Sequence, residues 1–233
     1  LIISGSAGAG GFNIFNIATG GDLSISGVTV SGAQTSGSGG AFNNAGTLTI
    51  SNSTISGNTA NGSGGGIRNT GGANLNISNS TLSGNSATNS GGGIYNNGAL
   101  TVTNSTISGN TATNSGGGIF NAGTLTVNNS TISTNTATLS RGGGIFNTVT
   151  LTVTNSTISG NSATSSHGGG IYNNSGTITL TNSTLSGNTA GSFGAGIDNF
   201  GTLNIANTII ANSTSGGDYA GGGTIGTNTN NLV

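Results

Sequence analysis

The sequence contains no cysteine, proline, methionine or tryptophan, and it has neither lysine nor glutamate. Without cysteine the chain cannot form disulfide bonds or thiolate metal sites. Two arginines and three aspartates give a net charge of -1 at pH 7, so the chain lacks the basic surface that nucleic acids and anionic membranes attract. No apolar run is long enough to span a bilayer. We therefore predict no nucleic-acid partner and no direct membrane insertion.

Glycine is abundant, with 48 of 233 residues, and asparagine, serine and threonine supply most of the rest. One phrase, Gly-Gly-Gly-Ile-(Tyr/Phe)-Asn followed by Thr-Leu-Thr-Val-Thr-Asn-Ser-Thr-Ile-Ser-Gly-Asn-Thr-Ala, returns about every 26 residues. A disordered low-complexity tract would not keep its apolar residues at fixed positions of such a phrase. The period therefore indicates one structural unit stacked many times.

Four columns of large apolar residues set the register of this repeat. The first is Phe42, Ile67, Ile94, Ile119, Ile145, Ile171 and Ile197; the second Leu23, Leu48, Leu75, Leu100, Leu125, Leu151, Ile178 and Leu203. The third is Ile25, Ile50, Ile77, Val102, Val127, Val153, Leu180 and Ile205; the fourth Val30, Ile55, Leu82, Ile107, Ile132, Ile158, Leu185 and Ile210. We expect Ile3 to begin the fourth column and Ile225 to end the first.

Within one unit, residues 100–103 and 106–108 alternate apolar and polar side chains as half-buried strands do, and residues 118–120 form a third short strand. Three short strands in about 26 residues fit one turn of a parallel β-helix, in which each rung pairs with the rungs on either side. We therefore predict an all-β parallel β-helix solenoid of about eight rungs.

The solenoid is predicted to form a single domain over residues 1–233. Residues 1–22 are its degenerate N-terminal rung, 23–210 its regular repeats and 211–233 its degenerate C-terminal rung.

Three columns of asparagine fall at the predicted corners. They are Asn69, Asn96, Asn121, Asn147, Asn173 and Asn199; Asn52, Asn79, Asn104, Asn129, Asn155, Asn182 and Asn207; and Asn58, Asn85, Asn110, Asn135, Asn161 and Asn188. Asparagine tolerates the left-handed backbone of a sharp corner, and stacked amides can hydrogen-bond along the rod axis. We interpret all three columns as structural ladders.

The segment Gly-Gly-Gly-Ile-Tyr-Asn-Asn-Gly-Ala-Leu-Thr-Val-Thr-Asn-Ser-Thr-Ile-Ser-Gly-Asn, residues 91–110, resembles the repeat of secreted bacterial right-handed parallel β-helix proteins, including the polymorphic outer-membrane-protein type. The segments 207–212 and 226–233 are similar to the closing part of large surface-anchored proteins that carry such repeats. The resemblance implies a right-handed coil, which parallel crossovers also favour, and a bacterial cell-surface or extracellular location. It implies no particular activity, because this scaffold serves adhesins, lyases and structural fibres.

Catalytic groups are scarce. A lyase or hydrolase on this scaffold would need clustered carboxylates, whereas Asp22, Asp198 and Asp218 lie on different rungs, so we expect no carboxylate pair. His167 occupies the turn position that Arg141 holds one rung earlier, and stacking would bring the two within about one strand spacing. We interpret His167 as part of a variable solvated turn, with a metal-binding or nucleophilic role as the alternative. No enzyme activity, catalytic residue, metal or cofactor is predicted.

An outward column follows the first buried one, and its large members are Arg68, Tyr95, Phe120, Phe146 and Tyr172. We expect an exposed strip of rings with Arg68 over Tyr95, available for packing against another rod or for stacking on sugar rings. The alternative is that neighbouring loops cover the rings or that the rings only stabilise one another.

Threonine forms a second outward pattern. Its members are Thr101, Thr103, Thr126, Thr152, Thr154, Thr179 and Thr181, beside Thr106, Thr131, Thr157 and Thr184 on the next strand. Such flat hydroxyl arrays resemble the faces of ice-binding proteins, although Asn76, Asn128, Asn204 and Ala206 interrupt this one. Threonine is also simply a good strand former.

These observations lead to one main functional hypothesis and two alternatives. The main hypothesis is a non-catalytic extracellular structural protein whose rods assemble with copies of themselves, head to tail or laterally, into a surface filament or stalk. The first alternative is an adhesin that binds surface glycans through the aromatic strip. The second is an ice-binding protein that uses the threonine columns.

Overall fold

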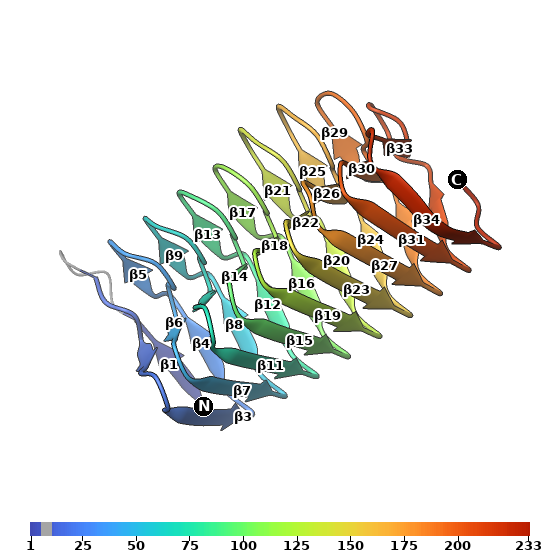
Figure 1. Ribbon diagram of the computed structural model, residues 1–233. Coiled ribbons are helices and arrows are strands. Elements are labelled where there is room, and N and C mark those ends of the chain that lie inside the picture. Colours follow the sequence, from blue (N-terminus) through green and yellow to red (C-terminus); the bar gives the residue numbers. More distant parts are fainter. Residues whose placement is uncertain (6–10) are drawn as a thin grey trace.

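The protein, described by a computed structural model over residues 1–5 and 11–233, is a rod of stacked parallel strands with its two termini at opposite ends (Figure 1). Four parallel sheets run along the rod, and each turn of the chain visits them in the order B, C, A and D as named below. None of the described residues belongs to a helix long and apolar enough to cross a bilayer. The all-β solenoid prediction is confirmed, with about nine turns in place of eight.

Sheet B carries the strands that follow the glycine triplets. They are β2 (Phe15–Ile17), β6 (Phe42–Asn44), β10 (Ile67–Asn69), β14 (Ile94–Asn96), β18 (Ile119–Asn121), β22 (Ile145–Asn147), β26 (Ile171–Asn173), β30 (Ile197–Asn199) and β33 (Tyr219–Ala220).

Sheet C contains the longest strands. They are β3 (Asp22–Ser26), β7 (Thr47–Ser51), β11 (Asn74–Ser78), β15 (Ala99–Thr103), β19 (Thr124–Asn128), β23 (Thr150–Thr154), β27 (Thr177–Thr181), β31 (Thr202–Ala206) and β34 (Thr224–Thr229).

Sheet A repeats the pattern Thr-Ile-Ser. Its strands are β1 (Ile2–Ser4), β4 (Thr29–Ser31), β8 (Thr54–Ser56), β12 (Thr81–Ser83), β16 (Thr106–Ser108), β20 (Thr131–Ser133), β24 (Thr157–Ser159), β28 (Thr184–Ser186) and β32 (Ile209–Ala211).

Sheet D is a fourth sheet of two-residue strands, where we expected turns. Its strands are β5 (Gln34–Thr35), β9 (Thr59–Ala60), β13 (Ser86–Ala87), β17 (Thr111–Ala112), β21 (Thr136–Ala137), β25 (Ser162–Ala163) and β29 (Thr189–Ala190). Two residues are enough to form each of these strands, because the alanine is buried against the core while the threonine faces outward. The prediction of three strands per rung is therefore wrong by one.

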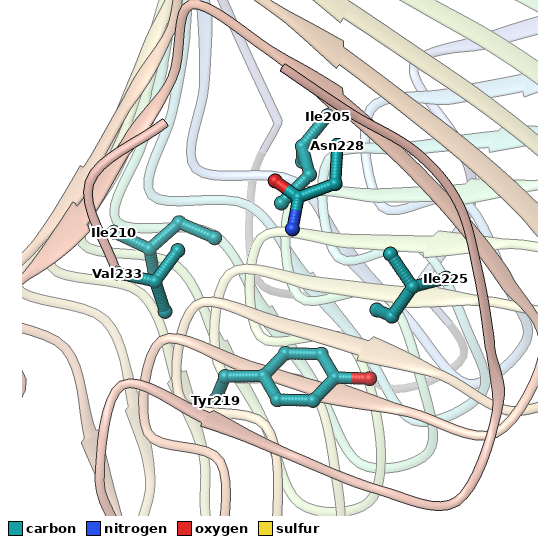
Figure 2. Close-up of a pocket in the computed structure, with 6 residues that line it drawn as sticks. All are labelled: Ile205, Ile210, Tyr219, Ile225, Asn228 and Val233. Carbon is teal, nitrogen blue, oxygen red and sulfur yellow. The ribbon is translucent and has the colours of Figure 1, made fainter. Parts of the chain in front are cut away.

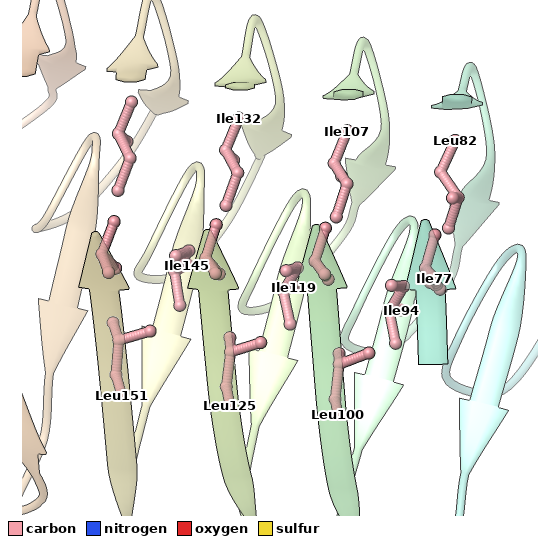
Figure 3. Close-up of a cluster of buried hydrophobic side chains, with 14 of the residues drawn as sticks. Ile77, Leu82, Ile94, Leu100, Ile107, Ile119, Leu125, Ile132, Ile145 and Leu151 are labelled. Atoms are coloured by element: carbon pink, nitrogen blue, oxygen red, sulfur yellow. The ribbon is translucent and has the colours of Figure 1, made fainter. Parts of the chain in front are cut away.

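The apolar columns form the core, like residue over like residue, as Figure 3 shows for the central rungs. Ile107 pairs with Ile132, Leu100 with Leu125, and almost every column residue between β6 and β31 is fully buried. Burying such a side chain stabilises the fold by about 1.5 to 3 kcal/mol, but only when the neighbouring rungs are present to cover it. The predicted registers are confirmed by the strand pairing, including that of Ile3 opposite Val30.

The C-terminal turn departs from the repeat. We expected Ile225 to end the first apolar column, but Ile225 pairs with Leu203 of the second column, and Tyr219 lies opposite Ile197 at the end of the first. This turn is also shorter than the others, and the register of β31 against β34 shifts between Leu203 and Ile205. The prediction for Ile225 is therefore wrong.

Two of the asparagine columns are buried and form amide ladders. In the ladder between sheets B and C, each Nδ2 donates to the Oδ1 of the next rung over 2.7 to 2.9 Å, from Asn44 to Asn199. In the ladder between sheets A and D, which runs from Asn58 to Asn188, the backbone N–H of each asparagine also donates to the next Oδ1. Every amide-to-amide bond in both ladders runs from Nδ2 to an Oδ1 on the C-terminal side, while in the second ladder Nδ2 also donates to a carbonyl of the preceding rung, as Asn110 does to Leu82.

The remaining asparagine column, between sheets C and A, behaves differently. Its members are exposed, and those from Asn52 to Asn207 have φ between 49° and 51°. Side-chain contact along this column is sparse, as in the bond of 3.2 Å from Asn182 to Asn155. The two properties that we assigned to all three columns are thus divided: one column provides the left-handed corner and the other two provide the ladders.

A serine ladder lies beside the exposed asparagines, and the sequence analysis did not identify it. Its members are Ser53, Ser80, Ser105, Ser130, Ser156 and Ser183, all buried. Each Oγ donates to the carbonyl two residues before it and accepts from the N–H of the preceding rung, as Ser105 does over 2.7 and 3.1 Å. These bonds satisfy backbone groups that turn away from the sheets.

The glycine triplets turn the chain where no side chain fits. At Gly116, φ is 68°, and a Cβ atom on Gly117 would lie 2.4 Å from the Gly143 carbonyl oxygen of the next rung. The corner between sheets D and B therefore depends on glycine.

Candidate functional site

The predicted aromatic strip exists as a stacked column on the outer side of sheet B. Ring centroids lie 4.9 Å apart for Tyr95 and Phe120, 4.8 Å for Phe120 and Phe146, and 5.3 Å for Phe146 and Tyr172. The ring planes of the first two pairs are almost parallel, with interplanar angles of 3° and 7°. Because each ring covers the face of its neighbour, the interior of the column presents ring edges outward.

The column is less exposed than we expected. Tyr95, Phe120 and Phe146 are half-buried, and Tyr172 is only 3 % exposed. The first glycine of each triplet brings the preceding loop against sheet B: a Cβ on Gly168 would lie 2.6 Å from that of Tyr172. The loops therefore cover part of the strip, which was the alternative interpretation of this column.

Arg68 does not lie as predicted. The guanidinium of Arg68 is directed toward Asn43 on the preceding rung, with Nη1 3.4 Å from Oδ1, and not toward Tyr95. The cation–π contact that the structure shows is at the other end of the column, where Cζ of Arg141 lies 4.9 Å from the Tyr172 ring centroid. The loop that carries Arg141 passes over sheet B and brings it there.

The histidine has a carboxylate partner, contrary to the sequence analysis. His167 Nδ1 lies 3.0 Å from Asp198 Oδ2, and neither atom has another polar contact among the described residues. Asp198 is 1 % exposed and the His167 side chain 28 % exposed. Asp198 follows Tyr172 in the outward column of sheet B, and the Gly168 turn folds His167 over it. Periodicity did not reveal this pair because the direction of a loop is not part of the repeat.

Burial controls the titration of this group. Desolvation raises the pKa of Asp198, and the nearby His167 and Arg141 offset only part of that increase. The pKa of Tyr172 is also raised, mainly by burial, with Arg141 acting in the opposite direction. Asp198 is therefore held in place at an electrostatic cost that its two basic neighbours reduce.

The arrangement provides an anchored imidazole but not a complete catalytic set. A histidine on a carboxylate activates a nucleophile only when a hydroxyl or thiol lies within hydrogen-bond reach, and no described hydroxyl group is bonded to His167. Among residues 1–5 and 11–233, no three His, Asp or Glu side chains lie close enough together to bind a metal ion. The other aspartates lie apart, and Asp218 accepts a hydrogen bond of 2.8 Å from the backbone N–H of Ser213.

A cavity of about 200 Å³ opens at the C-terminal end of the rod. It is lined by Ile205, Ile210, Tyr219, Ile225, Asn228 and Val233, whose side chains surround the opening in Figure 2. The short last turn leaves the interior of the solenoid uncovered at this point, so the end surface is mainly apolar.

The threonine columns have the predicted register. In sheet C, Thr101, Thr126, Thr152 and Thr179 pair in sequence, and Asn76 and Asn204 flank them. Sheet A is more regular. Its outward threonines are Thr54, Thr81, Thr106, Thr131, Thr157 and Thr184, and its outward serines are Ser56, Ser83, Ser108, Ser133, Ser159 and Ser186. Both columns of sheet A are uninterrupted over these rungs.

Comparison with known proteins supports the fold and extends no further. Neither the curated proteins nor the solved structures gave a match to this chain. A protein family described as the right-handed β-helix region matches residues 13–185. This match covers most of the rod, from the β2 rung to the β28 rung. By its repeat, its stacked parallel sheets and this match, the chain belongs to the right-handed β-helix family.

Proposed function

We propose that the protein is a non-catalytic structural rod, the subunit of a bacterial cell-surface or extracellular filament or stalk that assembles by stacking of β-helices. The observation that carries the proposal is that successive rungs have nearly the same sequence and structure. Each rung binds the next through parallel strands, an amide ladder and like-on-like apolar columns. The upper face of a rung is therefore complementary to the lower face of any other rung, including one on another copy.

The end surfaces of the described rod support this proposal. At one end β33 and β34 are the last strands of sheets B and C and border the apolar cavity, while β32, among the described residues, pairs beyond β28 only with Leu232. At the other end Leu1 and Ile2 are 85 % and 71 % exposed at β1, the outermost strand of sheet A. Free strand edges with apolar residues and no lysine or glutamate favour pairing with another edge. A head-to-tail contact of this kind repeats without closing. In a longer chain, only the outermost rungs would stack in this way.

Electron microscopy and sedimentation of the purified chain test the proposal. We expect fibres one rod wide, and we expect Ile225→Lys with Val233→Lys to disperse them, because both side chains lie at the end cavity. Thr152→Lys, on the flank of sheet C, is the matched control and should leave the fibres intact. Short dispersed rods at concentrations well above micromolar would contradict assembly. Loss of fibres with Thr152→Lys alone would indicate lateral packing instead.

The regular hydroxyl array of sheet A supports a second candidate, binding to ice. Its threonine and serine columns repeat at one strand spacing, about 4.8 Å, on a surface without charged side chains. We would then expect thermal hysteresis or inhibition of ice recrystallisation that is lost with Thr131→Lys and Thr157→Lys. Activity that persists in that double variant would exclude sheet A as the ice-binding face.

The third candidate, a glycan-binding adhesin that uses the aromatic strip, has weaker geometric support. Sugars stack on ring faces, whereas the faces inside the column from Tyr95 to Tyr172 are covered by neighbouring rings. Glycan binding that survives Tyr95→Ala together with Tyr172→Ala would exclude the strip as the site.

A further inference from the structure

One loop of each rung differs in sequence from one rung to the next, whereas the rest of the 26-residue repeat stays nearly the same. This loop connects sheet D to sheet B. In the earlier rungs its tip carries small polar residues, Asn61, Asn89 and Asn114, and in the later rungs it carries Leu139, Arg141, His167 and Phe193. Loops that vary on one face of a solenoid commonly form its binding surface. The later tips are therefore the part of this chain most suited to a specific ligand.

These later tips converge on two neighbouring residues of sheet B. Tyr172 and Asp198 pair in register between β26 and β30. Arg141 lies over the first, with 4.9 Å from Cζ to the ring centroid, and His167 lies against the second at 3.0 Å. The Phe193 ring is 5.6 Å from the imidazole, at an angle of 40°. Three successive loops thus contribute to one surface cluster, which we call the tip cluster: Arg141, His167 and Phe193 over Tyr172 and Asp198.

The tip cluster presents one cationic side chain and one aromatic side chain to solvent and conceals its carboxylate. Arg141 is exposed, Phe193 is 62 % exposed, and Asp198 is almost completely buried beneath His167. The only other arginine, Arg68, lies four strand spacings away along the column, roughly 19 Å. A negatively charged ligand is therefore favoured at this place on the rod more than elsewhere.

The shape of the tip cluster favours a sugar over a peptide. Phe193 stands outside the stacked column with much of its surface free, as a pyranose ring requires. Strands β26 and β30 are paired on both sides, so no sheet edge is available here for an extended peptide. Arginine binds carboxylates through two parallel N–H groups. The imidazole of His167, whose Nδ1 faces Asp198, adds a further donor in its protonated form, in which both ring nitrogens carry a hydrogen.

We propose that the tip cluster is a binding site for a carboxylated sugar, with the carboxylate on Arg141 and His167 and the apolar face of the ring on Phe193. Asp198 acts as a positioning residue that holds the imidazole. This site does not depend on whether the rods stack into fibres, and it does not use the ring column from Tyr95 to Phe146.

Titration of the intact chain with a tetrasaccharide of alternating glucuronate and N-acetylglucosamine, and with an N-acetylneuraminate-terminated trisaccharide, tests this proposal by calorimetry or NMR. We expect saturable binding of at least one. The control is the carboxyl-reduced form of the ligand that binds. Its affinity should be lower by a factor of at least about ten, because a charge-assisted hydrogen bond contributes about that factor. Arg141→Gln and Phe193→Ala should each weaken binding similarly.

Arg68→Gln provides the matched protein control, since it removes the other arginine without touching the tip cluster, and it should bind like the unmodified chain. All of these variants change exposed or half-buried side chains, so circular dichroism should show an unchanged fold. The proposal is overturned if neither carboxylated probe binds, if the reduced sugar binds equally well, or if Arg68→Gln weakens binding as much as Arg141→Gln. Equal affinity for a glutamate-rich peptide would assign the site to proteins instead.

Discussion

The two corners on either side of sheet A use the same residue for opposite purposes. At the corner before it, Asn104 is exposed, has φ of 49° and makes little side-chain contact. At the corner after it, Asn110 is fully buried and its amide takes part in four hydrogen bonds, to Leu82, Asn85 and Asn135. The first corner needs the conformational tolerance of asparagine, and the second needs its donors and acceptor. A residue repeated in a sequence therefore does not imply a repeated role.

The largest effect should follow from removing a buried amide. Asn110→Ala leaves the Asn85 N–H and the Leu82 carbonyl without their side-chain partner in a site closed to water. Since each of these two unsatisfied buried groups costs about 1 to 3 kcal/mol, we expect a loss of about 2 to 6 kcal/mol in the free energy of unfolding. Urea unfolding followed by circular dichroism measures it. A loss below about 1 kcal/mol would mean that the ladder contributes little beyond the strand pairing.

The serine ladder should show an intermediate effect. Ser105→Ala removes the acceptor of the Ser80 N–H and the donor to the Thr103 carbonyl, while the side-chain volume hardly changes. We expect a loss of about 2 kcal/mol by the same urea titration. Ser108→Ala, on the outward side of the same rung, is the control and should stay within about 0.5 kcal/mol of the original chain.

The exposed corner should respond to backbone conformation alone. Asn104→Ala forces an alanine into the left-handed region and should cost about 1 to 2 kcal/mol, whereas Asn104→Gly should stay within about 0.5 kcal/mol. The paired change at the buried corner gives the contrast, because Asn110→Gly should cost at least as much as Asn110→Ala. If glycine rescued position 110 but not position 104, the assignment of the two corners would be reversed.

The smallest effect on stability should come from the charge of Asp198. Its neighbour Asn199 is an equally buried but neutral amide, so the two residues compare a titratable group with one that does not titrate. The pKa of Asp198 is raised above its usual 3.8, so between that value and the folded pKa the native state binds more protons than the unfolded one. Stability must then fall as pH rises through this window. We expect Asp198→Asn to flatten that decline in a series of urea titrations from pH 3 upward. An unchanged slope would show that another group causes it.

The sequence predicts the repeated part of the fold well because the side chains that form it recur with the period. The columns through Ile107 and Leu100, their registers and the two buried asparagine ladders follow directly from spacing. The strand of Thr111 and Ala112 was not predicted, because a two-residue segment carries too little alternation to be distinguished from a turn.

The candidate site was less predictable because it depends on features that do not repeat. His167 and Asp198 are 31 residues apart, and only the path of one loop brings them together.

Two details of the fold were also missed. Asn104, Ser105 and Thr106 recur as one triplet, so periodicity could not separate the left-handed corner at the asparagine from the buried serine ladder beside it. Ile225 was misassigned because the last turn abandons the common length.

The amide-to-amide bonds of both ladders all point the same way, from Asn44 toward Asn199 and from Asn58 toward Asn188. Their side-chain dipoles therefore add along the axis and do not cancel, and each ladder begins with an acceptor and finishes with a donor. Two rods joined tail to tail would bring like dipole ends together. Any polymer that extends these ladders must accordingly be directional, with a tip and a base that differ chemically, and it can grow only by adding subunits in a single orientation.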